Sequence, residues 1–489
     1  MEINQRKTPI YDQVLELAKK QPYSLHVPGH KNGRIFNEIG YEHFKEVLRF
    51  DLTELPGLDD LHAPEGMIKD AQQLAANWFG AMETFFLVNG STVGNLAMIM
   101  ATCQSGDMVL VQRNCHKSIL HGLELAGVRP VFLAPEFDHD TERYDHPSIK
   151  TLENASELYP EAKALILTYP DYFGKTFELK QMIEKAHQRN MVVLIDEAHG
   201  CHFSIPYLSS PSAVSLGADI VVQSAHKMTP RFNDGGAFLH VNKTERVDVH
   251  RLQYYLQMLQ SSSPSYLIMI SLDLARHYLA NYKREQFYQL MRYMDEAREI
   301  FATNDFWRLE EQEEMDDPLK CVWKINPSLT PAMVAEVCQS EGLIPELVTE
   351  QDILFIFGLE PTIPVRSLKN TIKKIKDRLK LLTNHDRIET NNRFIPYRTN
   401  ELALSYQEMK EKDSKWVKLE NTIGYIAAEA IVPYPPGIPL LVKGGEYITD
   451  EHVQQIHTFQ ANHILFQPSN VLDGLYVFEK EKKDQSEGE

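Results

Sequence analysis

Short apolar runs separated by amphipathic stretches dominate the first half of the chain. Seven of them have the length of strands and are apolar at nearly every position: FFLVNG, MVLVQR, PVFLAP, ALILTYP, VVLIDEA, IVVQSA and GAFLHV. Continuous rather than alternating apolar character indicates strands that are buried on both faces, and most of the runs have a helical pattern between them. The pattern therefore predicts a large α/β domain over residues 66–275.

The flanking segments predict a chain of several parts. Residues 1–65 are rich in turn signals, such as SLHVPGHKNG, and are expected to form an N-terminal arm. Residues 276–383 begin with a long helical pattern and then alternate, which predicts a connecting helix and a small α/β domain. The polar stretch TNHDRIETNNRF is a candidate linker.

The end of the chain differs from the rest in composition. Residues 395–480 include PYPPGIPLLVKGGEYIT, which has too much Pro and Gly for a helix and too much apolar character for a free tail. We expect a separate C-terminal domain there. The charged residues 481–489 are expected to be disordered.

Composition limits the classes of function. The chain has 489 residues, too many for one core, and a net charge of −18, which argues against a nucleic-acid or anionic-membrane surface and is compatible with a cationic ligand. The basic stretch RSLKNTIKKIKDRLKLL is therefore interpreted as a solvated helix face. Five scattered cysteines without a CxxC pair disfavour a disulfide scaffold or a zinc ribbon. No run approaches eighteen apolar residues and the start lacks a signal-peptide core, so we expect a cytoplasmic protein.

Two of the predicted strands are followed or ended by residues whose side chains could take part in chemistry. VVLIDEAHG ends its apolar run at Asp196, and VVQSAHK continues from its run to Lys227. A lone lysine after a strand is usually solvated. However, an acid and a lysine at the ends of neighbouring parallel strands would face one crevice, where open α/β sheets bind their ligands.

Two further motifs could complete a cofactor site. VNGSTVGN places Gly90, Ser91 and Thr92 where a strand gives way to a helix, so backbone N–H groups and hydroxyls could hold a phosphate, although a plain capped helix fits as well. In VQRNCHKS, His116 follows a strand, where an imidazole could lie on an aromatic ring. With Asp196 and Lys227, these motifs suggest pyridoxal phosphate.

Metal binding and nucleotide hydrolysis fit less well. Asp196, His199, Cys201 and His202 cluster in sequence, as do His26 and His30, but their spacing matches no metal-site pattern. The GKT string at residues 174–176 lacks the first glycine of a phosphate-binding loop, because Tyr169 stands there. We therefore predict no metal and no nucleotide-driven motor.

Eight motifs taken together resemble the Orn/Lys/Arg decarboxylase family, in particular its shorter Gram-positive-type members. They are HVPGHK, GLDDLHAP, VNGSTVGN, NCHKS, DEAHG, SAHK, SSSPSY and PYPPGIPLL, in this order, and the resemblance runs from about residue 5 to 475. It implies a fold type I pyridoxal-phosphate enzyme with a seven-stranded, mostly parallel sheet. It also implies a homodimer, or a higher homo-oligomer, with its sites at the subunit interface.

The resemblance also implies roles for single residues. Lys227 is expected to form the Schiff base with the cofactor, Asp196 to contact the pyridine nitrogen and His116 to stack on the ring, with His226 as a further catalytic residue. The remaining cofactor contacts implied are Gly90, Ser91, Thr92, Ala198, Ser224 and His226. A proton must return to Cα after carbon dioxide leaves, and Lys227 and His226 both remain candidates.

Substrate contacts are less constrained by sequence. A distal ammonium or guanidinium needs a carboxylate that does not also bind the pyridine, and the candidates are Asp59, Asp60, Asp171 and Glu446. Ser262, Ser263 and Tyr266 of SSSPSY are candidates for the neighbouring subunit's site.

The sequence also departs from the common family pattern. Tyr169 and Asp171 stand where relatives commonly have Asn and Thr, Arg231 and Asp234 fall in a stretch that is usually apolar or hydroxylated, and Tyr425 replaces a frequent Arg. These departures are expected near the site, where they could alter substrate choice or reduce activity.

The predicted function is pyridoxal-phosphate-dependent decarboxylation of arginine, lysine or ornithine, in polyamine synthesis or acid resistance. Two alternatives remain open. One is another fold type I activity, such as an aminotransferase or lyase, and the other is a catalytically silent, cofactor-binding paralogue.

Overall fold

The architecture is taken from a computed structural model of the whole chain. It describes residues 3–20, 22–233, 235–382, 399–434, 438–461 and 464–479.

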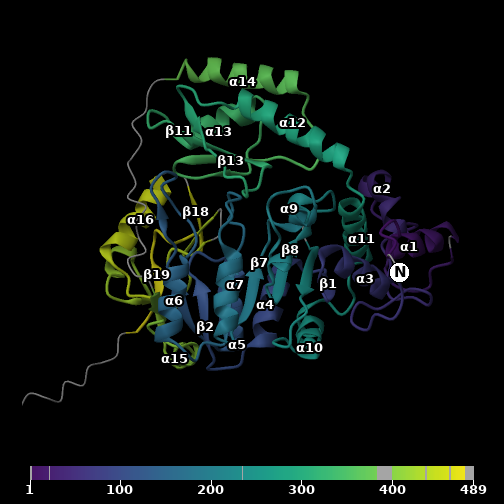
Figure 1. Cartoon of the computed structure of the whole chain (residues 1–489), viewed down its shortest axis with the longest axis horizontal. Helices are drawn as coiled ribbons and strands as arrows, with labels where there is room; N and C mark the ends of the chain where they lie inside the picture. Colours follow the sequence, from purple (N-terminus) through teal and green to yellow (C-terminus); the bar gives the residue numbers. More distant parts are fainter. Residues whose placement is uncertain are drawn as a thin grey trace, which may run out of the picture.

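An eight-stranded sheet forms the centre of the molecule (Figure 1). Its strands, in spatial order, are β1 (Glu83–Leu87), β9 (Ala237–Val241), β8 (Ile220–Ser224), β7 (Val192–Asp196), β6 (Ala164–Thr168), β2 (Met108–Gln112), β3 (Arg129–Leu133) and β14 (Thr399–Glu401). Strands β8, β7, β6, β2 and β3 are parallel to one another, whereas β9 pairs antiparallel with β8 and β1, and β14 pairs antiparallel with β3. The seven apolar runs all become strands, so the predicted α/β fold with a mostly parallel sheet is confirmed. The expected number of seven strands is one too few, because the polar strand β14 pairs with β3 at the sheet edge.

Side chains of the sheet strands alternate between two hydrophobic cores. In β2, Val109 and Val111 pack in the core on one face, whereas Leu110 packs in the core on the other. Helices α4 (Gly90–Thr102), α5 (Lys117–Ala126) and α10 (Val249–Leu259) cover the first face. Helices α6 (Ile149–Leu158) and α7 (Leu179–Gln188) cover the second. Burial on both faces is the reason why the inner strands are apolar at most positions.

The N-terminal segment packs against the edge of the large domain. Helix α1 (Pro9–Lys20) contacts α3 (Met67–Phe79) and α11 (Tyr266–Ala280). Asp273 on α11 accepts a hydrogen bond from the Ile10 backbone N–H at 3.0 Å. Helix α2 (Glu38–Phe44), by contrast, has no buried residue.

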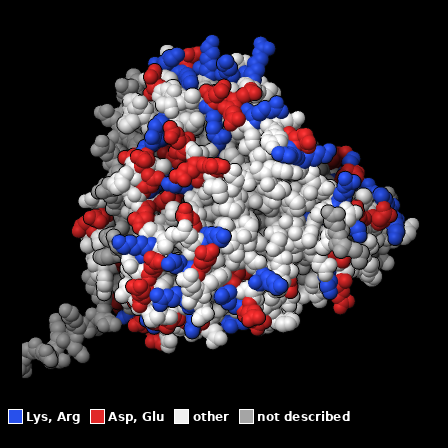
Figure 2. Space-filling view, in the orientation of Figure 1, with Lys and Arg blue, Asp and Glu red and all other residues white. Residues whose placement is uncertain are grey.

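A second, antiparallel sheet forms a smaller layer above the large domain in Figure 1. Its strands are β10 (Trp307–Leu309), β11 (Lys320–Ile325), β13 (Asp352–Ile356) and β12 (Leu347–Val348), and its helices are α12 (Arg284–Ile300), α13 (Pro331–Ser340) and α14 (Val365–Leu379). In α14 the buried residues are Leu368, Ile372, Ile375 and Leu379, which repeat with helical spacing. The lysines and arginines on its other face gather along the top of the molecule in Figure 2, as the solvated-face interpretation expects.

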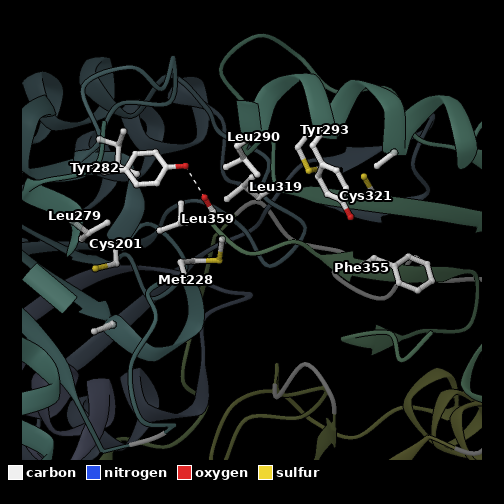
Figure 3. Close-up of a cluster of buried hydrophobic side chains, with 14 of the residues drawn as sticks. Cys201, Met228, Leu279, Tyr282, Leu290, Tyr293, Leu319, Cys321, Phe355 and Leu359 are labelled. Carbon is white, nitrogen blue, oxygen red and sulfur yellow. Dashed lines mark hydrogen bonds between the residues drawn. The ribbon is translucent and has the colours of Figure 1, made fainter. Parts of the chain in front are cut away.

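The junction between the large and small domains is hydrophobic (Figure 3). Met228 and Leu279 belong to the same buried cluster as Leu319 and Leu359. The Tyr282 hydroxyl donates a hydrogen bond to the Leu359 carbonyl at 2.6 Å. Since Met228 follows Lys227 directly, this core positions the small domain beside the predicted site.

The C-terminal part has its own core around Ile431, Leu441, Ile456 and Leu475. It contains β15 (Ser414–Val417), β16 (Ile426–Ala427), β17 (Val432–Tyr434), β18 (Leu465–Gln467), β19 (Leu475–Phe478), α15 (Tyr406–Glu411) and α16 (Asp450–Ala461). The predicted linker and the tail at 481–489 lie outside the described residues. The domain boundaries at 65, 275, 383 and 395 stay predictions.

Candidate active site

A cavity of about 1070 Å³ lies at the carboxyl ends of β7 and β8, where Asp196 of β7 pairs in register with Val222 of β8. This is the edge at which open α/β sheets bind ligands. All nine predicted catalytic and cofactor-binding residues line the cavity: Gly90, Ser91, Thr92, His116, Asp196, Ala198, Ser224, His226 and Lys227.

Lys227 is held inside this cavity. It lies on the short helix α9 (Ala225–Met228), and its Nζ is 3.0 Å from His199 Nε2. Burial lowers the pKa of Lys227 below its ordinary value, and the Asp196 carboxylate opposes this shift. A lysine with a lowered pKa carries a neutral, nucleophilic amine at a lower pH than a solvated lysine does.

His199 is a residue that the sequence suggested only as a metal-cluster member. Burial, together with the charges of Lys227 and Lys320, holds its pKa well below the ordinary value. Its neutral ring can therefore accept a hydrogen bond from Lys227. The Tyr172 ring packs edge-on against it, with 4.6 Å between centroids.

Asp196 presents one carboxylate oxygen without a partner. The side chain is only 3% exposed, and its Oδ2 accepts a hydrogen bond from Asn95 Nδ2 at 2.9 Å. Its Oδ1 is buried and has no hydrogen-bond partner among the described residues. A buried acceptor of this kind calls for a donor, and the N–H of a protonated pyridine ring would supply one.

His116 stands at the N-terminus of α5 with its ring fixed on one side. Its Nδ1 lies 3.2 Å from the Ser118 backbone N–H and 2.8 Å from the Ser118 hydroxyl. Burial lowers the pKa of His116, so the imidazole is neutral near pH 7. A neutral ring can stack on an aromatic cofactor without adding a charge beside Lys227.

The first turn of α4 is suited to an anion. The N-cap residue Asn89 makes no side-chain cap, and the hydroxyls of Ser91 and Ser224 are hydrogen-bonded to each other at 2.7 Å. Gly94 allows the helix to approach the sheet closely, since a Cβ there would lie 2.7 Å from Leu87 Cδ1. Backbone N–H groups and paired hydroxyls at a helix start can hold a phosphate.

Most of the acids that the sequence offers as substrate contacts interact with other parts of the chain. Asp171 lines the cavity, where burial raises its pKa to about 6 and its carboxylate accepts a hydrogen bond from the Lys175 backbone N–H. The structure places Asp59, Asp60 and Glu446 outside the cavity lining of their own chain. Sequence reasoning selected them for their charge alone.

Hydrogen bonds and an ion pair engage the carboxylates of Asp59, Asp60 and Glu446 outside the cavity. The Asp59 carboxylate accepts hydrogen bonds from the backbone N–H groups before and within the first turn of α3. Asp60 Oδ1 accepts one from the His62 backbone N–H at 2.8 Å. Glu446 pairs with Arg113 at 3.5 Å in a different cavity.

Of the sequence departures that the structure describes, only Asp171 lines the cavity. The Arg231 guanidinium donates hydrogen bonds to the Gly236 carbonyl at 2.8 Å and to Ser271 Oγ at 2.9 Å, which ties it to α11. The Tyr169 hydroxyl donates to the Pro211 carbonyl. Lys415 lies over the ring of Tyr425 in the C-terminal part. Asp234 lies outside the described residues.

The motif SSSPSY divides in the structure. The Tyr266 hydroxyl donates a hydrogen bond to the Asp59 carbonyl inside its own chain, and the side chain is buried. Ser262 and Ser263 are exposed. Only these two serines of the three candidates are therefore available to a neighbouring subunit.

No group of three or more His, Cys, Asp or Glu side chains within the described ranges is arranged to hold a metal ion. His202, one of the clustered residues, is instead 3.0 Å from Asp317 in a fully buried pair.

None of the described helices has the length and apolar character needed to cross a membrane.

The fold defines the class of protein first. The structure of Escherichia coli constitutive lysine decarboxylase matches with a TM-score of 0.79, covering 97% of this chain and 82% of that chain at 17% identity. Lysine decarboxylase A from Pseudomonas aeruginosa matches with a TM-score of 0.76 at 20% identity, covering 97% of this chain and 77% of that chain. At these identities the likeness shows the fold alone, and this chain shares the architecture of both structures.

Sequence comparison then gives the family. Residues 8–330 match the model of the Orn/Lys/Arg decarboxylase major domain, and residues 385–467 match that of its C-terminal domain. The chain belongs to the Orn/Lys/Arg decarboxylase family, so the family predicted from the eight motifs is confirmed.

Relatives from Bacillus align along nearly the whole chain. The uncharacterized protein YaaO of Bacillus subtilis is 38% identical over 92% of this chain and 93% of its own length. An arginine decarboxylase of Bacillus anthracis is 33% identical over 93% of both. A lysine decarboxylase of Pseudomonas aeruginosa, LdcA, is 30% identical over 55% of this chain and 39% of its own length.

Proposed function

We propose that this protein is a pyridoxal-phosphate-dependent decarboxylase of a basic amino acid. The observation that carries the proposal is that Lys227 and a buried Asp196 line the same cavity. Asp196 Oδ1 has no hydrogen-bond partner among the described residues. Family membership supports the same chemistry.

Each part of the cofactor has a residue suited to it. Lys227 Nζ is the nucleophile that would hold the aldehyde, Asp196 Oδ1 would accept the pyridine N–H, and the neutral His116 ring would lie against the face of the ring. Ser91, Thr92, Ser224 and His226 would hold the phosphate, with Gly90 and Ala198 as backbone neighbours. When bound, pyridoxal phosphate supplies an electron sink for the bond between Cα and the carboxylate.

Two side chains govern charge and protons in this proposal. Asp196 must stay ionised, because only a carboxylate keeps the pyridine nitrogen protonated. Lys227 Nζ lies inside the cavity and would serve as a proton donor once it no longer holds the cofactor. His199, 3.0 Å from Lys227 Nζ, accepts a hydrogen bond from it and directs it.

Glu346 is the carboxylate that we propose for the distal cation of the substrate. Three carboxylates line the cavity in the described part of the chain, namely Asp171, Asp196 and Glu346. Asp196 is assigned to the cofactor, and the half-buried carboxylate of Asp171 is already engaged by the Lys175 backbone N–H at 2.7 Å. Glu346 is exposed, lines the cavity and accepts a hydrogen bond from the Tyr172 hydroxyl at 2.8 Å. Its carboxylate is therefore accessible to an ammonium or guanidinium group.

Arginine is the first substrate to test, because the aligned Bacillus decarboxylases of known name are arginine decarboxylases. Purified protein with added pyridoxal phosphate should develop the visible absorbance of a lysine-bound cofactor and release carbon dioxide from arginine, lysine or ornithine. Lys227→Ala should lose both signals. Lys185→Ala removes a half-exposed lysine paired with Glu153 and should lose neither.

The alternatives give different results in the same assay. A keto acid product would identify an aminotransferase. Cofactor absorbance without any product from the twenty amino acids would identify a silent paralogue and reject the proposed activity.

We also propose that the protein is at least a homodimer, with Ser262 and Ser263 facing the partner's site. Sedimentation analysis should give the mass of two chains or a multiple of it. A monomer with full activity would contradict this assembly.

A further inference from the structure

A chain of hydrogen bonds joins the two cofactor-facing residues Asp196 and His116 behind the cavity wall. Asn95 Nδ2 donates both to Asp196 Oδ2 and to Ser118 Oγ, each at 2.9 Å. Ser118 Oγ in turn lies 2.8 Å from His116 Nδ1. Asn95 and Ser118 are each 1% exposed. Neither lines the cavity.

Hydrogen counting fixes the direction of every bond in this chain. The Asn95 amide nitrogen has two hydrogens, and both are used. If the amide were rotated by 180°, its oxygen would face the Asp196 carboxylate, which offers no hydrogen when ionised. Because Ser118 Oγ accepts from Asn95, its own hydrogen is free to point at His116 Nδ1. The Ser118 backbone N–H points at the same nitrogen.

The chain has a consequence at each end. At Asp196, one oxygen is occupied by Asn95 and the carboxylate is fixed, so that Oδ1 alone is left for the cofactor. At His116, two donors converge on Nδ1, so that this nitrogen stays unprotonated and the hydrogen resides on Nε2. The orientation of Asp196 and the tautomer of His116 are thereby set together.

We infer that Asn95 and Ser118 are positioning residues: they hold the Asp196 carboxylate oriented for the pyridine nitrogen, and they hold His116 as the neutral Nε2–H tautomer. This inference rests on the proposed function for its purpose, whereas the hydrogen bonds themselves do not depend on a cofactor. Asn95 and Ser118 end the motifs VNGSTVGN and NCHKS, so both were present in the sequence without an assigned role.

Other charges around these groups must be considered in any pH test. His116 faces Asp196 from β7 and Lys227 from α9, and on its own helix it faces Lys117 and His121. Cys115 lies near Asp196. All of these stay in place when Asn95 or Ser118 is replaced, so a comparison with the unmodified protein isolates the effect of the substitution.

The first experiment measures the dissociation constant of pyridoxal phosphate across pH 6 to 9 for the unmodified protein and for two variants of Asn95. Asn95→Ala should weaken binding about tenfold or more, as loss of an outer partner does at other ligand-holding residues. Asn95→Asp should weaken it further at high pH, because the introduced carboxylate repels Asp196. As pH falls, one proton enters the pair and the introduced carboxyl can donate to Asp196, so binding should recover relative to the unmodified protein.

Two controls accompany this measurement. Asn242→Ala removes a partly buried amide that donates to the Val214 carbonyl at 2.9 Å, outside the cavity lining, and should leave cofactor affinity unchanged. Thermal unfolding with and without cofactor separates folding defects from binding defects. The ratio of the cofactor dissociation constants of Asn95→Asp and the unmodified protein should change with pH. A constant ratio would overturn the role of Asn95.

The second experiment uses cofactor-free protein labelled with ¹⁵N-histidine, with the His116 signal assigned by its loss in His116→Gln. The unmodified protein should show the Nε2–H tautomer. Ser118→Ala removes one donor to Nδ1, so protonation becomes easier and the His116 pKa should rise. Ser156→Ala, which removes a buried serine hydroxyl bonded to the Leu152 carbonyl, should leave it unchanged.

The two experiments separate the inference from the proposed function. If the unmodified protein binds no pyridoxal phosphate, the proposed function fails, yet the histidine titration still decides the role of Ser118. If the cofactor binds but His116 is an Nδ1–H tautomer, or does not respond to Ser118→Ala, the inference fails while the function stands.

Discussion

The two walls of the cavity are built in different ways. The wall from the central sheet carries Asp196 and His116, whose positions are fixed by buried hydrogen bonds to Asn95 and Ser118. The opposite wall comes from the loop at residues 170–173 and from the small domain, and it carries the half-buried Asp171 and the exposed Glu346. One wall is thus suited to hold a cofactor in a fixed geometry, and the other to contact substrates that differ in their distal group.

The opposite wall depends on contacts between domains. Lys320 of the small domain is fully buried and donates a hydrogen bond to the Tyr172 carbonyl at 2.8 Å. Burial lowers the pKa of Lys320 to about 8. Arg143 adds a second contact, since its guanidinium pairs with Glu310 at 2.6 Å and with Asp352 at 3.0 Å. Substitutions on the two walls should therefore have different consequences.

The largest effect on activity is expected for Lys227→Ala, on the sheet wall. This variant loses both the covalent attachment point and the proposed proton donor, and proton transfer alone typically contributes roughly 10²–10⁴-fold to a rate. Initial rates of carbon dioxide release should fall to background. Substantial activity in this variant would show that the sheet wall does not carry the chemistry.

Arg143→Met tests whether the opposite wall is held by its ion pairs. It leaves Asp352, which is buried, without its cationic partner, and breaking such a buried pair costs about 3 kcal/mol or more. Urea denaturation should show this loss of unfolding free energy. Arg129→Met, which removes an exposed pair with Glu401, should change stability by less than about 0.5 kcal/mol. Equal stability of the two variants would contradict the proposed role of Arg143.

Asp196→Asn tests the charge of the sheet wall without a change of shape. An amide cannot keep the pyridine nitrogen protonated, so kcat should fall by about 10²–10³-fold, as when one electrostatic partner of a reaction is removed. Asp219→Asn is the matched control, because Asp219 is equally buried but accepts hydrogen bonds from the Val193 backbone and His187. If both variants lost the same activity, burial rather than charge would be the cause.

The sheet wall was largely predictable from sequence, and the reason is physical. Strands buried on both faces must be apolar throughout, so Asp196 stands out as the residue that ends such a run, and Lys227 follows the next strand in the same way. Strand β14 could not be predicted, because three polar residues at a sheet edge carry no hydrophobic pattern.

The opposite wall could not be predicted for a different reason. Glu346 reaches the cavity only because the small domain folds over the large one, and no local pattern distinguishes it from other surface acids. Only their charge makes Asp60 and Glu446 candidates in the sequence. In the structure, Asp60 accepts a hydrogen bond within a turn and Glu446 forms an ion pair with Arg113. Arg231 was expected near the site but turns toward Ser271, a partner that is forty residues away in sequence.

The smallest effect is expected for Glu346→Gln, and it should be of a different kind. The side chain is exposed, and an ion pair at such a site contributes modestly, so KM for the basic substrate should rise by about two- to fivefold while kcat changes little. Glu336→Gln, an exposed glutamate on α13 that does not line the cavity, should leave both constants unchanged. A fall in kcat with constant KM would move Glu346 from substrate recognition to the chemical step. In that case the opposite wall would take part in the chemical step as well as in substrate recognition.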